Sequence, residues 1–194
     1  MKKILIGLVA IVVIAVGVNL FLPSVNSITD FKHIAYTDAF NQKESEYYVY
    51  FYQEKCGLCQ QFGPELVSAH NENNIPVYVV DMALDENLDA WYDWDAHDRA
   101  YTKVIGKMVN GVEVLNEGES RALYPSNEGW TISTNQNDEI VAYNGNPQNN
   151  VTPQSAQQIE ISGTPTLLKI KDGQFAGYAE GIDEARSLLA TYGK

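Results

Sequence analysis

The sequence has few cysteines and few basic residues, and each shortage excludes a class of protein. Two cysteines among 194 residues are too few for a scaffold of several disulfide bonds or for a Cys₄ zinc or iron–sulfur site. Lysine and arginine number 13 against 25 aspartates and glutamates, a net charge of −12. Because so acidic a protein repels phosphate backbones, we expect no nucleic-acid partner. No glycine-rich phosphate loop or catalytic Ser/His/Asp set stands out either.

Charge is absent from one long stretch near the N-terminus. Lys2 and Lys3 precede residues 4–22, which carry no charged side chain. About 20 apolar residues span a bilayer as a helix, whereas a cleaved signal peptide has a core of roughly 7–15. We therefore expect residues 1–27 to be an uncleaved membrane anchor, with cleavage near Ser27 and secretion as the alternative. Basic flanks stay in the cytoplasm, so residues 28–194 are expected outside a bacterial cell membrane.

The part after the anchor begins with a pattern typical of a β-α-β unit. Residues 47–52 and 75–80 are continuous aromatic and aliphatic runs, as in strands that are buried on both faces. Between them, residues 60–71 have helical spacing, with Pro64 as a kink. Strand, helix and strand at this spacing predict a parallel pair.

A second recognisable pattern lies at the C-terminal end. Residues 166–170 and 174–178 flank Asp172-Gly173 and predict a β-hairpin. Residues 182–192 predict an amphipathic helix. Thr152-Pro153 has the composition of a helix start.

Residues 82–151 separate these two ends and are expected to be an insertion. Apolar residues between 84 and 92 and between 100 and 108 are spaced for one or two helices. Residues 130–133 and 139–143, joined by a polar turn, predict a hairpin. The insertion also holds Trp91, Tyr92 and Trp94, which we expect to build its core, with a peptide-binding surface as the alternative.

The two cysteines form the most informative motif, Cys56-Gly57-Leu58-Cys59. A zinc site needs two further ligands, and the three histidines are not paired at ligand spacing; they are His33, His70 and His97. A c-type haem needs a histidine after the second cysteine, where Gln60 stands. We therefore expect no metal and no cofactor, and a structural disulfide or a redox pair remains.

The position of the motif favours a redox pair. Cys56 follows a predicted buried strand and starts a predicted helix, where free N–H groups and the helix dipole stabilise a thiolate. Cys59 lies one turn further along and is placed to resolve a mixed disulfide. We expect Cys56 to be the nucleophile.

The stretch 49–66, with both cysteines and Pro64, resembles the active-site segment of the thioredoxin superfamily. The later stretch Gly163-Thr164-Pro165, followed by the predicted hairpin, resembles the family's cis-proline strand. The resemblance implies an α/β thioredoxin-like fold, a central mixed sheet flanked by helices, in residues 28–194. It further implies that Pro165 is cis and packs beside Cys56, and that substrate binds along Thr164, Pro165 and the Gly57-Leu58 dipeptide.

Three positions depart from that family pattern. Tyr50 stands where thioredoxins carry a buried aspartate, and Leu58 replaces a proline. Lys55 replaces a tryptophan, and its charge is expected to favour the Cys56 thiolate. Glu54 is a candidate proton acceptor, although an exposed Glu-Lys pair is more often only solvated.

These observations predict an extracytoplasmic thiol–disulfide oxidoreductase whose substrates are exported protein or peptide thiols and disulfides. Oxidation or isomerisation is favoured slightly over reduction, in which a membrane redox partner would supply electrons. The alternative is a non-catalytic binding module for export or assembly of a secreted partner, with the insertion as its working surface.

Overall fold

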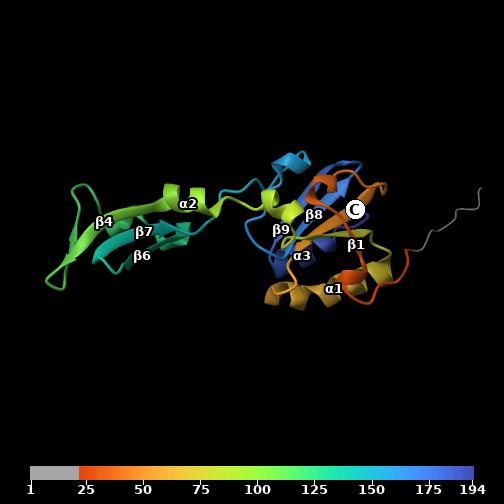
Figure 1. Cartoon of the computed structure of the whole chain (residues 1–194), viewed down its shortest axis with the longest axis horizontal. Coiled ribbons are helices and arrows are strands. Elements are labelled where there is room, and N and C mark those ends of the chain that lie inside the picture. Colours follow the sequence, from red (N-terminus) through yellow and green to blue (C-terminus); the bar gives the residue numbers. More distant parts are fainter. Residues whose placement is uncertain (1–21) are drawn as a thin grey trace, which may run out of the picture.

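The computed structural model describes residues 22–194, which form two β-sheets (Figure 1). The first sheet has the strand order β1-β3-β2-β8-β9 and the second the order β5-β4-β7-β6. Figure 1 shows the second sheet and α2 as a separate lobe, which extended segments join to the first. The strands of the first sheet are β1 (Lys32–His33), β2 (Glu46–Tyr52), β3 (Val77–Asp81), β8 (Thr166–Lys171) and β9 (Gln174–Glu180). Those of the second are β4 (Thr102–Val109), β5 (Val112–Leu115), β6 (Trp130–Thr134) and β7 (Glu139–Asn144), and the helices are α1 (Gly57–Asn73), α2 (Trp94–Tyr101) and α3 (Ile182–Leu189).

The predicted β-α-β unit is confirmed. β2 runs parallel to β3, and α1 connects the two strands. Alternate side chains of β2 enter two cores: Tyr48 and Tyr50 pack on one face of the sheet, and Tyr47 and Val49 on the other. Because both faces are covered, the strand reads in the sequence as one continuous apolar run.

The predicted C-terminal hairpin and helix are also confirmed. β8 is antiparallel to both β2 and β9, so the sheet is mixed. Asp172 and Gly173 have φ values of 52° and 73°, the left-handed conformation that a tight two-residue hairpin turn requires. α3 follows and buries Ala185 and Leu189. Strand order, direction and connections agree with the expected thioredoxin-like α/β fold.

Within residues 22–194, α-helices cover one face of the first sheet and not the other. α1 and α3 pack there, whereas short 3-10 turns cover the opposite face. The α-helix predicted at Thr152-Pro153 is wrong, since the nearest helical segment is a 3-10 turn at Ala156–Gln158. The reason is local side-chain bonding: Asn150 Oδ1 accepts the N–H of Thr152 at 3.1 Å, which favours a turn over a helix.

The insertion differs most from the prediction. Residues 100–108 do not form a helix, because β4 starts at Thr102, and β5 was not predicted at all. A register shift between Val104 and Gly106 interrupts the alternation of β4, so its apolar residues fall at intervals that resemble helical spacing. Gly106 is required here, because a Cβ at this position would lie 2.5 Å from the carbonyl oxygen of Val114.

Other parts of the insertion are closer to expectation. The hairpin of β6 and β7 is confirmed, whereas the segment after β3 forms a 3-10 helix, Asp85–Ala90, instead of an α-helix. The second sheet has a small core of its own, made of Ile105, Tyr124, Ile140 and Ala142. The predicted insertion 82–151 therefore contains a separately packed sheet.

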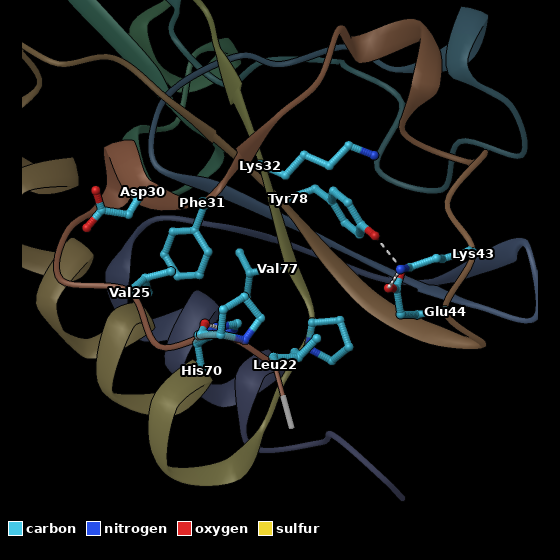
Figure 2. A pocket seen from close by; sticks show the side chains of 12 residues that line it. Leu22, Val25, Asp30, Phe31, Lys32, Lys43, Glu44, His70, Val77 and Tyr78 are labelled. Atoms are coloured by element: carbon cyan, nitrogen blue, oxygen red, sulfur yellow. Dashed lines mark hydrogen bonds and ion pairs between the residues drawn. The ribbon is translucent and has the colours of Figure 1, made fainter. Parts of the chain in front are cut away.

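Of the predicted membrane anchor, residues 1–27, only residues 22–27 belong to the described part of the chain, and residues 4–21 of its uncharged stretch lie outside it. Within residues 22–194, no helix is long and apolar enough to cross a membrane. The first described residues run along the end of α1, where His70 Nε2 lies 3.0 Å from the carbonyl oxygen of Pro23 and Asn71 Oδ1 accepts the N–H of Val25 at 3.0 Å. A cavity of about 270 Å³ lies beside this segment. Figure 2 shows its lining, with Val25 on one side and Tyr78 on the other.

Candidate active site

The two cysteines lie where β2 ends and α1 begins. Cys56 is the N-cap residue of α1 and is partly exposed, whereas Cys59 is only 4% exposed. A disulfide joins them, with their Cα atoms 5.2 Å apart. The backbone N–H of Cys59 donates a hydrogen bond to Cys56 Sγ at 3.1 Å. After reduction, the same N–H and the helix dipole stabilise a thiolate on the more accessible sulfur.

The second motif meets the first at this point. The Thr164–Pro165 peptide bond is cis, as predicted. The carbonyl oxygen of Thr164 lies 3.3 Å from Cys56 Sγ, although 108 residues separate the two in sequence. The fold therefore brings the cysteine motif and the cis-proline loop, residues 161–165, into direct contact.

Tyr50 lies beneath the cysteines and is fully buried. Its hydroxyl donates to the carbonyl oxygen of Cys59 at 3.4 Å, and its ring stacks on Tyr52 with centroids 5.8 Å apart. Burial raises the pKa of the Tyr50 phenol far above its ordinary value of 10.0. The group is therefore neutral at physiological pH and does not act as a proton acceptor.

The other predicted neighbours of the cysteines are open to solvent. Glu54, Lys55 and Gly57 are exposed, and the Leu58 side chain is 49% exposed. None of the ion pairs within residues 22–194 joins Glu54 to Lys55. The rim of the site on this side thus combines one apolar side chain with separate solvated charges.

Reasoning from sequence missed a hydrogen-bond network beside the cis-proline loop. The hydroxyl of Ser162 donates to Glu180 Oε2 at 2.5 Å, and the Tyr178 hydroxyl donates to the same oxygen at 3.3 Å. Asn149 Nδ2 in turn donates to the Tyr178 hydroxyl at 3.0 Å. Burial and the Glu180 charge raise the pKa of Tyr178 to about 12. No local motif links these residues, because β9 and the end of the insertion bring them together.

The aromatic residues at the start of the insertion hold the cis-proline loop. The indole N–H of Trp94 donates to the carbonyl oxygen of Ser162 at 3.1 Å, and the N–H of Tyr92 donates to that of Ile161 at 3.0 Å. Trp91 packs against the core of the first sheet. Tyr92 and Trp94 also pack on His97, a buried residue of the insertion, with ring centroids 5.7 and 5.0 Å away. The expectation that these aromatic residues pack within the insertion is therefore confirmed for Tyr92 and Trp94 and wrong for Trp91, although none of the three belongs to the core of the second sheet.

The histidines have structural partners. His97 lies between the hydroxyl of Tyr92, at 2.9 Å, and the carbonyl oxygen of Asn144, at 2.7 Å. In the part of the chain that the structure describes, no group of three or more His, Cys, Asp or Glu side chains is placed to hold a metal ion.

No protein-family model matches the sequence, and no curated protein matches it. Among solved structures, the chain is similar to mitochondrial thioredoxin 3 from Saccharomyces cerevisiae in its oxidised form, with 13% identity and a TM-score of 0.40 over 84% of this chain and 93% of that one. Thioredoxin f2 from Chlamydomonas reinhardtii is similar at 12% identity and a TM-score of 0.38, over 84% and 96% of the two chains. A structure that concerns the thiol resolving mechanism of a yeast mitochondrial 1-Cys peroxiredoxin is similar at 13% identity and a TM-score of 0.38, over 85% of this chain and 96% of that one. Similarity at this level establishes neither the activity nor the substrate of this chain, which rest on its own geometry.

Proposed function

We propose that this chain is a thiol–disulfide oxidoreductase that acts on protein or peptide substrates, with Cys56 as the nucleophile and Cys59 as the resolving cysteine. The observation that carries the proposal is the position of Cys56 Sγ. It accepts a hydrogen bond from the Cys59 N–H at a helix start and lies 3.3 Å from the carbonyl oxygen of Thr164. A purely structural disulfide that closes so small a loop would stabilise the fold little.

The exchange proceeds in two balanced steps in either direction. In reduction of a substrate, the Cys56 thiolate attacks one substrate sulfur, a mixed disulfide forms, and the other substrate sulfur leaves as a thiolate. The Cys59 thiolate then attacks Cys56 Sγ, which forms the internal disulfide and releases the second substrate sulfur. In oxidation, a substrate thiolate attacks Cys56 Sγ, and Cys59 leaves as a thiolate. A second substrate thiolate then attacks the substrate sulfur of the mixed disulfide, which forms the substrate disulfide and releases Cys56 as a thiolate. The cysteine pair itself carries the electrons, so the proposal needs no cofactor.

The proposed location is the outer side of a bacterial cell membrane. It rests on the uncharged residues 4–22 behind Lys2 and Lys3. Exported protein thiols are then the substrates, and a membrane redox protein is the proposed partner. We propose oxidation or isomerisation over reduction, because Tyr50 occupies the position of a buried carboxylate and does not take the Cys59 proton.

Trapping of the mixed disulfide tests the activity. Cys59→Ser retains the nucleophile without the resolving thiol, so it should accumulate a mixed disulfide with a cystine-containing peptide, detected by mass spectrometry. Cys56→Ser should form none under the same conditions, because Cys59 is buried. Equal trapping by both variants, or by neither, would contradict the proposal.

The reduction potential of the cysteine pair tests the direction. Equilibration with glutathione buffers should give a value near that of strong oxidases or isomerases, about −120 to −180 mV. A value of about −270 mV or below would instead assign the protein to the reductases.

The alternative, a non-catalytic binding module, is favoured by one observation. The second sheet exposes four valine side chains, which are Val104, Val109, Val112 and Val114. If binding by this sheet were the whole function, Cys56→Ser would preserve the biological activity, whereas the oxidoreductase proposal predicts its loss.

A further inference from the structure

Beside the cis-proline loop lies a carboxylate, that of Glu180 on β9, which forms no ion pair with a basic side chain of residues 22–194. Glu180 lies opposite Thr166 across β8 and β9, and the N–H of Gly181 donates to the carbonyl oxygen of Pro165 at 2.9 Å. Glu180 Oε1 lies above Gly163, where a Cβ would be only 2.7 Å away. The carboxylate is thus placed against the loop whose Thr164 touches Cys56.

Glu180 is held by neutral groups alone. Its contacts are the hydroxyls of Ser162 and Tyr178, both to Oε2. None of the ion pairs within residues 22–194 includes Glu180. All of them join carboxylates in other parts of the fold to lysine or arginine. Glu180 is partly exposed and accepts hydrogen bonds only at Oε2, so Oε1 and the uncompensated charge remain open to a cation that a ligand supplies.

The carboxylate is also rigidly positioned and does not stand alone. Asn149 fixes the Tyr178 hydroxyl, and Trp94 fixes the carbonyl of Ser162, so both ends of the insertion support it. Glu184 lies at the same corner, because its Oε2 would be 3.1 Å from a Cβ on Gly181. Glu184 is exposed and is likewise in no ion pair of the described chain.

We infer that Glu180, assisted by Glu184, selects substrates in which lysine or arginine flanks the reacting cysteine. The inference rests on the proposed function and names its substrate class. A substrate segment that extends along Thr164 and Pro165 would place a neighbouring side chain at Glu180. An ammonium or guanidinium group there would form a charge-assisted hydrogen bond with Oε1, which accepts none from the described residues.

The test measures how fast three single-cysteine peptides react with the detergent-solubilised full chain in its disulfide form, and compares the three rates. The three peptides differ only in the residues on both sides of the cysteine, which are lysine, serine or glutamate. In each reaction one peptide thiolate attacks Cys56 Sγ and Cys59 leaves; a second peptide thiolate releases the peptide disulfide and the dithiol protein. Rates are divided by those of the same peptides with oxidised glutathione, which removes differences in intrinsic thiol reactivity.

We expect the normalised rate to be highest for the lysine peptide and lowest for the glutamate peptide. Glu180→Gln keeps the contacts to Ser162 and Tyr178 but removes the charge, so it should reduce the lysine-to-serine ratio about five-fold, the size expected for one partly exposed ion pair. Glu184→Gln should give a smaller loss, and added salt should weaken the preference.

The control is Glu72→Gln, which removes the same charge from an exposed position at the far end of α1. It should leave the preference intact. An equal slowing of all peptides by Glu180→Gln, or an equal loss of preference in Glu72→Gln, would overturn the inference. Reaction of the unaltered chain with all three peptides at similar normalised rates would overturn it too, while supporting the proposed oxidoreductase activity. Failure to react with any peptide would overturn the proposed function itself.

Discussion

In the proposed oxidoreductase, the side chain of Tyr50 limits which groups can take a proton from the cysteines. A buried carboxylate at this position could accept the proton of the resolving cysteine, whereas a buried phenol with a strongly raised pKa does not. In the proposed reaction, the Tyr50 phenol is therefore not the group that takes the proton of Cys59. The Tyr50 hydroxyl instead donates a hydrogen bond to the backbone carbonyl oxygen of Cys59.

Tyr50→Phe should accordingly leave the chemistry unchanged. We expect the pH profile of peptide exchange between about pH 6 and 9 to keep its shape, because the phenol remains protonated throughout this range. The lost hydrogen bond should lower the free energy of unfolding by about 1 kcal/mol. Stopped-flow rates and urea unfolding measure the two effects. A displaced pH profile would show that the phenol takes part in proton transfer.

At the scale of elements, an ion pair ties β2 to β8. Glu46 lies 2.8 Å from Lys169 Nζ, and the side chains are 11% and 6% exposed. Burial alone would raise the pKa of Glu46, but hydrogen bonds from Lys169, the Gly193 N–H and Lys171 outweigh it and lower the pKa below the ordinary value. Since the folded-state pKa lies below the unfolded one, this stabilisation is present above about pH 4.5 and is lost as the pH falls through the folded value.

Glu46→Gln should therefore destabilise the protein in a pH-dependent way. We expect a loss of about 3 kcal/mol in the free energy of unfolding at pH 7, at the lower end for a broken buried pair because Lys169 keeps its bonds to Thr191. The difference from the unaltered chain should shrink at pH 3. Glu65→Gln, which breaks the exposed pair with Arg186, is the control and should cost under about 1 kcal/mol. Urea unfolding at both pH values measures the effect, and equal losses for the two variants would refute it.

The contact between the insertion and the cis-proline loop gives a second prediction at this scale. Trp94→Phe removes the indole N–H that donates to the carbonyl oxygen of Ser162, which should lower the free energy of unfolding by about 1 kcal/mol. Because the loop is then less firmly held, peptide exchange should slow while the reduction potential stays the same. Trp130→Phe changes a tryptophan of the second sheet that packs on Tyr124 and should leave exchange unaffected. A change in potential with Trp94→Phe would mean that the loop tunes the sulfurs directly.

The elements differ in how far they could be predicted from the sequence. β2 and β3 are continuous apolar runs, and Asp172-Gly173 marks a turn, so local patterns suffice. β4 was mistaken for a helix because its bulge disturbs the period of two. The contact of Ser162 with Glu180 was missed for another reason: Ser162 precedes β8 and Glu180 ends β9, so both residues lie outside the strands 166–170 and 174–178 of the predicted hairpin.

At the scale of the whole molecule, the two sheets have separate cores. No residue between 95 and 147 belongs to either core of the first sheet, and the core of the second lies wholly within that range. The backbone N–H of Gln148 donates a 3.1 Å hydrogen bond to the Tyr92 hydroxyl, so the two ends of the insertion lie close together. A short linker can therefore replace residues 95–147.

Replacement of residues 95–147 by a short Gly/Ser linker should consequently leave a folded, redox-active domain. We expect a cooperative urea transition and a reduction potential equal to that of the full chain, since the cysteines, Thr164, Trp94 and Asn149 are all retained. Circular dichroism and glutathione equilibration measure both. A molten product would show that the first sheet needs the second in order to fold.

The separation of Cys56 from Thr164 by 108 residues also has a consequence in time. A chain that is made or exported from its N-terminus releases both cysteines long before the loop that covers them. During this delay β2 can pair with β3, but its other edge stays open until β8 arrives. If the second sheet folds in the interval, it joins Tyr92 to Gln148 and shortens the loop that remains to be closed. A folded insertion would then shorten the interval during which Cys56 lacks its contact with Thr164.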